Sequence, residues 1–201
     1  MNKKLYRYFI ETRAHHNLRR DFPQNLAAEF SASGLSPEER MTRRFELLCQ
    51  AEKPQMQPFE KIVLMRTVKK QPDIFTEAEW ADIRAKHYIH ELGFVSNLSL
   101  DYGRVIGSGL LAVRENADAY GRRVIDAIID LCDRYKRLAV EQDRRDVVEV
   151  LSRVPRYGAT NFREALQMFR ILHYALWLEG DYHNTVGRFD QYIYPYFKRD
   201  M

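Results

Sequence analysis

The amino-acid sequence predicts a mainly α-helical protein with at most a few short strands. Three observations support this fold class: helix start signals recur along the chain, apolar residues repeat at helical spacing, and glycine or proline punctuates the repeats. The chain has 201 residues, of which 45% are hydrophobic and 30% charged, so it is long enough for one sizeable folded domain.

The first 35 residues are expected to form a helical extension. Residues 3–20 are predicted to form one charged helix, which ends before Pro23. A short helix is expected next, and Gly34 follows it as a stop signal. We therefore expect an amino-terminal helical extension at residues 1–35 and the main domain at residues 36–201.

Two capping boxes open the next helices. In the first, Ser36 precedes a proline and is followed three residues later by Glu39; in the second, Thr76 is followed by Glu79. The second helix is expected to continue to residue 93. Between the two, residues 61–68 (KIVLMRTV) are rich in β-branched side chains, which is typical of a short strand or an extended segment.

Helices also dominate the second half of the chain. Asp101 is a plausible N-cap for the helices that follow it, and residues 117–142 carry one continuous apolar stripe. Thr160 is expected to cap a helix over residues 161–179, which Gly180 ends. That helix is apolar on nearly every face, so more protein is expected to enclose it.

The carboxyl-terminal segment is unusually aromatic. Five aromatic side chains lie between Phe189 and Phe197. Large aromatic side chains at this density rarely face water. We therefore expect either a partner surface or further protein to cover this segment.

Charge and hydropathy narrow the function classes. The formal charge is +4, but 32 basic residues are interspersed with 28 acidic ones, which is typical of solvated helix faces rather than of a nucleic-acid surface. No stretch approaches eighteen consecutive apolar residues, and the first residues lack the apolar core of a signal peptide. We expect a cytoplasmic protein with no membrane or nucleic-acid partner.

The two cysteines, Cys49 and Cys132, lie far apart in the sequence, each in an apolar helical stretch. Such cysteines are expected to be buried, reduced thiols, and neither belongs to a motif that would activate a nucleophile. Trp80 and Trp177 are expected in the core.

Five short motifs occur in a distinctive order along the chain. The segments are PQMQPFEKIV, SNLSLDYGRVIGSGLLAV, IIDLCDRYKRLAVEQD, RVPRYGATNFREALQ and VGRFDQYIYPYF. In the same order, the positions that match are Glu60; Asp101, Tyr102, Val105, Gly109 and Leu110; Arg134, Tyr135, Leu138 and Ala139; Val154, Pro155, Thr160, Phe162, Glu164, Ala165, Leu166 and Gln167; and Gly187, Arg188, Asp190, Gln191, Tyr192 and Pro195. Through these motifs and their order, the chain from about residue 36 onward resembles the amino-terminal part of glycyl radical enzymes of the pyruvate formate-lyase type.

The resemblance implies the amino-terminal helical part of the family's α/β barrel. In such enzymes a separate S-adenosylmethionine iron–sulfur activase places a radical on a glycine, the radical passes to a cysteine, and that cysteine abstracts hydrogen from a small substrate. This sequence contains neither the thiyl cysteine motif nor the glycine motif. We therefore expect no catalytic residue and no cofactor in this chain, and no activity by the chain alone.

Four residues are candidates for substrate binding: Asn97, Asp101, Arg188 and Asp190. Asn97 stands where the resemblance places a histidine, and an amide cannot act as a general base at neutral pH. Asp101 is more simply an N-cap. Arg188 and Asp190 occupy alternate positions of a possible strand, so they are expected either to grip an acidic substrate or, more simply, to form a buried ion pair.

A metal site has less support in the sequence than a substrate site. His87, His90 and Glu91 have the helical spacing that metal ligands can show, but no distant third ligand accompanies them, so no metal is predicted.

Two functional classes remain open. In the first, the chain is a fragment or subunit of a glycyl radical lyase or acyltransferase, and its partners are the rest of that enzyme or a complementary subunit, the activating enzyme and a small-molecule substrate. In the second, it is a stand-alone helical interaction module whose aromatic carboxyl-terminal segment docks on a partner.

Overall fold

The computed structural model describes residues 3–86 and 99–201. The helices in these ranges are α1 (Lys3–Tyr6), α2 (Leu26–Ala32), α3 (Pro37–Ala51), α4 (Glu77–Lys86), α5 (Tyr102–Ser108), α6 (Leu110–Glu115), α7 (Ala119–Glu141), α8 (Arg145–Arg153), α9 (Phe162–Glu179) and α10 (Phe189–Asp200), with a π-helical turn η1 (Arg7–Glu11) and a 3₁₀ turn η2 (Ala14–Leu18). Within these ranges there is no strand, and one isolated parallel bridge joins Arg20 to Val68. The predicted mainly α fold is confirmed.

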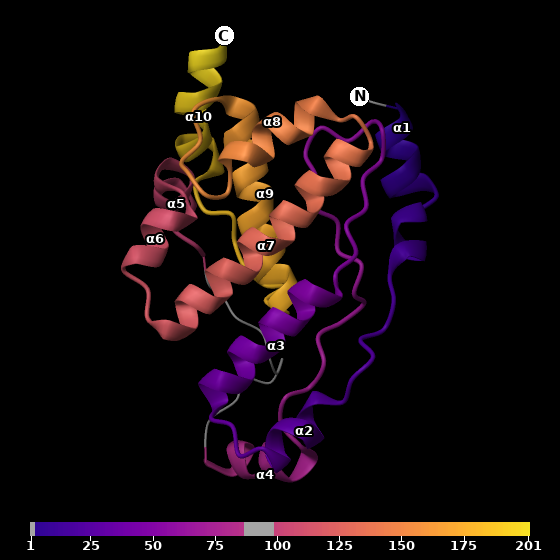
Figure 1. Ribbon diagram of the computed structural model, residues 1–201, viewed down its shortest axis with the longest axis vertical. Coiled ribbons are helices and arrows are strands. Elements are labelled where there is room, and N and C mark those ends of the chain that lie inside the picture. The colour runs from indigo at the N-terminus through magenta and orange to yellow at the C-terminus, as the bar shows by residue number, and fades with distance from the viewer. Residues whose placement is uncertain (1–2, 87–98) are drawn as a thin grey trace.

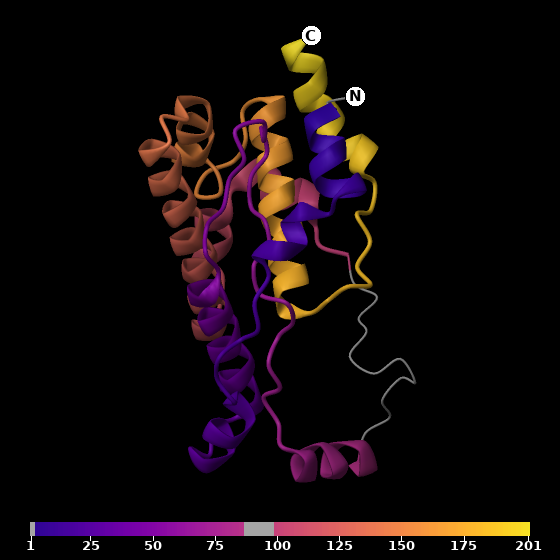
Figure 2. The ribbon, with the colours of Figure 1, turned by 90° about the vertical axis from the view of Figure 1, so that its right-hand side faces the viewer.

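The long helices α7 and α9 form the centre of the molecule. Helix α7 runs diagonally across the view in Figure 1 and packs along α3 and α8, with α9 behind it. Figure 2 shows α9 between the α7–α8 side and a second side formed by the amino-terminal segment and α10. The main core gathers buried side chains from α3, residues 56–68, α5, α7, α8 and α9. In the part of the chain that the structure describes, no helix is long and apolar enough to cross a membrane.

The amino-terminal residues do not form the single helix predicted for residues 3–20. The chain instead passes through α1, the π-helical η1 and the 3₁₀ turn η2, with Arg13 at φ +47°. The Thr12 hydroxyl donates to the Arg7 carbonyl (2.9 Å), a side-chain contact that competes with regular helical hydrogen bonding. Helix α2 then packs Leu26 and Phe30 against Ile74 in a small separate core.

Most of the predicted helix boundaries are correct because they depend on local contacts. The Ser36 hydroxyl accepts the Glu39 amide (3.3 Å), and Thr76 and Glu79 cap each other reciprocally. Gly180 ends α9 at φ +99°.

The start of α9 differs by one residue from the prediction. The N-cap is Asn161, whose side chain accepts the Glu164 amide (2.9 Å). The hydroxyl of Thr160 instead donates to the Glu164 carboxylate (2.8 Å), so it supports the cap without being the cap.

Residues 61–68 are extended but pair with side chains rather than with a second strand. The Gln167 amide oxygen accepts the Val63 amide (2.8 Å), and the Gln167 amide nitrogen donates to the Val63 carbonyl (3.1 Å). The Tyr135 hydroxyl does the same for Met65, at 2.9 and 3.1 Å. Glu52 accepts the amide of residue 67 (2.6 Å). Side chains of α7 and α9, with Glu52 at the end of α3, thus satisfy backbone groups that a neighbouring strand would otherwise satisfy.

Both cysteines are buried and free, as predicted. Burial raises the pKa of the Cys49 and Cys132 thiols, so both are protonated at neutral pH.

Candidate functional site

The described candidate residues lie at the starts of two neighbouring helices, α5 and α10. Asp101 directly precedes α5, and Arg188 and Asp190 lie at the start of α10. The Ser99 hydroxyl donates to the Thr185 carbonyl (3.4 Å), which links the segments that lead into the two helices. The structure therefore brings three of the four predicted residues into one region, which we call the α5–α10 junction. Asn97 lies outside the described residues, as do the three residues of the weak metal hypothesis.

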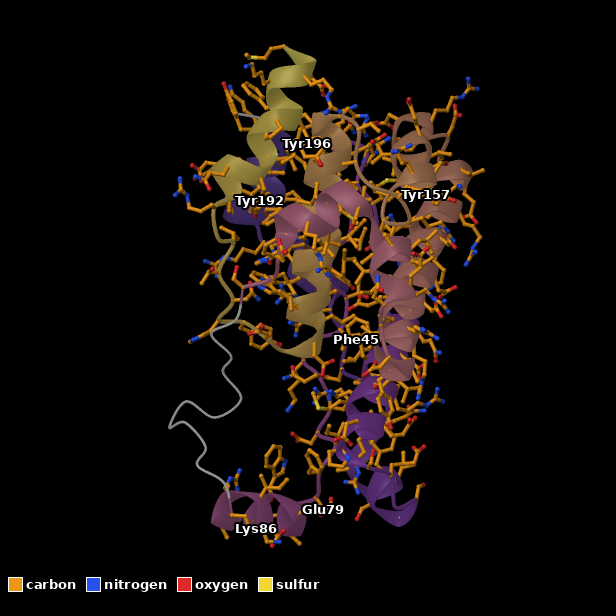
Figure 3. All side chains as sticks on the ribbon, turned by 90° about the vertical axis from the view of Figure 1, so that its left-hand side faces the viewer. Phe45, Glu79, Lys86, Tyr157, Tyr192 and Tyr196 are labelled. Carbon is orange, nitrogen blue, oxygen red and sulfur yellow. The ribbon has the colours of Figure 1, made fainter. Side chains whose placement is uncertain are left out.

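Close packing fixes the α5–α10 junction. The rings of Tyr102 and Tyr192 stack with centroids 5.8 Å apart. A Cβ placed on Gly103 would lie 3.1 Å from the Tyr192 Cβ, and one on Gly107 would lie 3.7 Å from the Tyr196 hydroxyl. Figure 3 shows Tyr192 and Tyr196 on α10, along the side that meets α5. Glycines on α5 let the two helices approach.

Asp101 is an N-cap, as predicted. One of its carboxylate oxygens accepts the Arg104 amide at 3.2 Å. The side chain is exposed, and its second oxygen has no partner among the described residues. Capping and a contact to a ligand are therefore compatible at this residue.

The predicted conformation of Arg188 and Asp190 is wrong. They form an ion pair with contacts of 3.1 and 3.2 Å, but at the start of a helix rather than along a strand. Their side chains are 68% and 70% exposed, so the predicted buried pair is also wrong. The guanidinium of Arg188 holds the pKa of Asp190 below its usual range. Both side chains are free to reorient toward a ligand, because an exposed ion pair is weak.

Sequence reasoning missed His173, which lies beneath the α5–α10 junction. Its Nδ1 lies 3.0 Å from the Tyr102 hydroxyl, and its ring stacks on Phe169 at 5.6 Å. Burial raises the pKa of Tyr102 to about 12 and lowers the pKa of His173. At neutral pH the pair therefore consists of a protonated phenol and an uncharged imidazole. Its one sequence signal is the i, i+4 spacing of Phe169, His173 and Trp177 on α9.

The segment that joins α9 to α10 adds acceptor oxygens to this region. One oxygen of Asp181 and the amide oxygen of Asn184 are buried and have no hydrogen-bond partner in the described ranges. The charge of Asp181 also acts on Tyr102 and His173. Acceptor oxygens and a neutral imidazole suit the binding of a hydroxyl-bearing molecule. Among the described residues no group of three or more metal-ligating side chains occurs.

The sequence matches the pyruvate formate lyase-like family over residues 23–201. The chain therefore belongs to this family. The match begins inside the predicted 1–35 extension, and the boundary at residue 35 stays a prediction. No curated protein matches the sequence.

Several solved structures share the fold. One, from work on 1,2-propanediol dehydration in Roseburia inulinivorans, has a TM-score of 0.71 at 19% identity and covers 100% of this chain and 37% of that one. The glycerol-bound glycerol dehydratase from Clostridium butyricum has a TM-score of 0.69 at 17% identity, over 92% of this chain and 34% of that one. A glycyl radical enzyme from Archaeoglobus fulgidus has a TM-score of 0.60 at 17% identity, over 94% and 37%.

The chain thus spans about a third of the length of these solved chains. The resemblance to the amino-terminal portion of glycyl radical enzymes, stated from the motifs, is confirmed at the level of family and fold.

Proposed function

We propose that this chain supplies the amino-terminal helical part of a glycyl radical enzyme that cleaves a bond in a small, hydroxyl-bearing substrate. The observation that carries the proposal is the family match over residues 23–201 together with a fold that spans about a third of solved glycyl radical enzymes. Two of the solved neighbours concern dehydration of a diol and of glycerol, which supports a hydroxyl-bearing substrate.

The chemistry requires residues outside this sequence. Its two cysteines are buried and protonated, which makes them unsuited to meet a substrate. The thiyl cysteine, the radical glycine and the activase would act with the rest of the enzyme, whether in the same polypeptide or in a complementary subunit. We therefore infer that the chain is inactive alone.

Within that enzyme, the α5–α10 junction is the part of this chain best suited to line the substrate pocket. Asp101 has one carboxylate oxygen without a partner in residues 3–86 and 99–201, and Arg188 with Asp190 offers an exposed charged pair. Asn97, four residues before Asp101, is proposed to contribute an amide to the same wall. These residues bind and orient the substrate, and none of them is assigned a proton transfer.

Radical formation tests the proposal. The coding DNA beyond and beside the Met201 codon is first read for a Cys-x-Glu loop and a carboxyl-terminal glycine motif. The chain alone and the chain expressed with that polypeptide are then treated anaerobically with an S-adenosylmethionine activase and examined by electron paramagnetic resonance. We expect a glycyl radical in the combined sample and none in the chain alone. A combined sample without radical would refute the proposal and favour the interaction module.

Substrate kinetics of the combined enzyme test the α5–α10 junction. Arg188→Gln is expected to raise KM several-fold with a smaller effect on kcat, because it removes a binding contact and no chemical step. Arg145→Gln, a side chain 92% exposed at the start of α8, is the matched control and should leave both constants unchanged. Equal effects of the two substitutions on KM would show that the α5–α10 junction does not line the substrate pocket.

A further inference from the structure

A cavity lies against α9 and includes none of the residues that define the α5–α10 junction. It is a cavity of about 820 Å³ between the amino-terminal segment, residues 59–69 and α9. This volume lies in the range of small-molecule sites. Figure 2 shows the amino-terminal segment beside α9. Helix α9 contributes Arg170, Tyr174 and Trp177 to the lining of the cavity.

Three guanidinium groups line the cavity, from Arg19, Arg66 and Arg170. No ion pair within the described ranges involves any of them, although sixteen ion pairs form elsewhere in those ranges. Arg170 donates twice to the Leu64 carbonyl, at 2.9 and 2.6 Å. Arg66 donates to three backbone carbonyls, those of residues 68, 69 and 177. Carbonyl groups accept these hydrogen bonds but neutralise no charge.

The one acidic side chain of the lining does not balance these charges. Glu60 is 6% exposed, accepts the Gln57 amide at 2.6 Å, and forms no ion pair with Arg170. Burial raises the pKa of Glu60, and its charge acts on Arg170 without a direct ion pair between the two side chains. Burial lowers the pKa of Arg170 although the charge of Glu60 acts in the opposite direction, which reflects the cost of burying a cation without a direct ion pair.

Arg19 provides an independent sign of a missing partner. Its Nε is buried and has no hydrogen-bond partner, and no hydrogen bond from its guanidinium to a described residue is formed. A buried donor without an acceptor is unfavourable, and an anion in the cavity would remove that cost.

The lining also holds His15 and two lysines, Lys61 and Lys69, which form ion pairs with Asp146 and Asp21, and the rest of it is mostly apolar and aromatic. Phe9 and Phe59 line the cavity from the amino-terminal side, and Trp177 from α9. Trp177 is 41% exposed, so the prediction that it lies in the core is wrong; its exposed face belongs to this cavity. Aromatic walls beside guanidinium groups suit a ligand with an apolar body and one anionic end.

We propose that this cavity binds a small organic carboxylate with an apolar or aromatic body. Its carboxylate lies among Arg19, Arg66 and Arg170, and its body lies against Phe59 and Trp177. The site is separate from the α5–α10 junction, so the proposal does not depend on the proposed radical chemistry.

Tryptophan fluorescence tests the site in the full chain. In a Trp80→Phe background Trp177 is the single tryptophan, and 4-phenylbutyrate is the probe. We expect a saturable change in fluorescence, with an affinity at least about tenfold higher than that of the uncharged 4-phenylbutyramide, since charge-assisted hydrogen bonds are strong.

Two substitutions locate the bound charge. Arg19→Gln, which breaks no hydrogen bond or ion pair of that side chain among the described residues, should weaken binding of the carboxylate about fivefold or more and leave binding of the amide unchanged. Arg145→Gln, far out in solvent, should change neither. Equal affinity for carboxylate and amide would overturn the anion site, and so would the absence of any saturable change with the chain folded by circular dichroism.

Discussion

The core around α7 and α9 differs sharply from the face formed by α10. In the core, the backbone of the extended segment 61–68 is paired with Gln167, Tyr135 and Glu52, each 1% exposed. In α10, Ile193 is the one buried residue, and two large aromatic side chains, Tyr194 and Phe197, are 54% and 42% exposed. The backbone of the extended segment is thus paired inside the core, whereas the α10 face exposes large aromatic side chains, as surfaces that bind other protein do.

Loss of a side chain that pairs the extended segment should have the largest effect. Gln167→Met keeps the volume but leaves the Val63 amide and carbonyl buried without partners, so we expect a loss of about 3 kcal/mol in the free energy of unfolding. Urea denaturation followed by circular dichroism measures it. Gln142→Met, at the exposed end of α7, should stay within about 0.5 kcal/mol. Similar losses in both variants would mean that the core contact is not the cause.

The charge network on α8 should give a smaller, pH-dependent effect. Asp146 accepts from Arg144 (2.9 and 3.1 Å), Arg163 (2.8 Å) and Lys61 (3.3 Å). These contacts, Arg144 first, hold the pKa of Asp146 well below its usual range.

Because the folded-state pKa of Asp146 is lowered, its stabilisation is present above the unfolded pKa of about 4 and is lost as the pH falls further. Asp146→Asn should therefore lower stability at pH 7 by about 1.5 kcal/mol, after allowance for solvent screening, and the two proteins should converge as the pH falls. Urea denaturation over a pH series measures the difference. A constant difference at every pH would contradict the assignment.

The hydrogen bond between Tyr102 and His173 lies where the core meets the α10 face. Tyr102 is 1% exposed, and Tyr102→Phe removes one hydrogen bond without changing the packing of the ring. We expect a loss of about 1 kcal/mol. Thermal denaturation of Tyr102→Phe measures this loss of stability, with the exposed Tyr157→Phe as the control. An unchanged stability of Tyr102→Phe would show that water replaces the lost hydrogen bond.

The exposed aromatic side chains should affect association far more than stability. Tyr194→Ser with Phe197→Ser should change the free energy of unfolding by less than about 0.5 kcal/mol for each site. Sedimentation at increasing concentration should show less self-association than in the parent chain, because the apolar surface is reduced. Val140→Ser, on an exposed position of α7, is the control. Unchanged association would show that the α10 face does not attract other protein.

The sequence was informative where structure depends on neighbours in the chain. Ser36, Thr76, Asp101 and Gly180 were all predicted as helix boundaries, and each acts within a few residues of itself. The wrong predictions concern structure that depends on residues far away in the chain. Alternation of Arg188 and Asp190 suggested a strand, but a strand needs a neighbour, and α10 instead packs as a helix along α5.

The candidate sites were harder to predict than the fold. The link between Asp101 and Arg188 depends on residues 99 and 185, which are far apart in sequence. The cavity depends on Arg19, Arg66 and Arg170, which no local motif connects. Periodicity reports which side of a helix is buried, but not which distant side chains meet there.

Hydrogen exchange of the isolated chain, followed by mass spectrometry of peptides, tests the contrast between core and face most directly. The account predicts strong protection of backbone amides in α7 and α9 and exchange at least about tenfold faster in α10, because few buried contacts hold that helix. Equal protection of α10 and α7 in a monomeric sample would contradict this contrast, since α10 would then be held as firmly as the core.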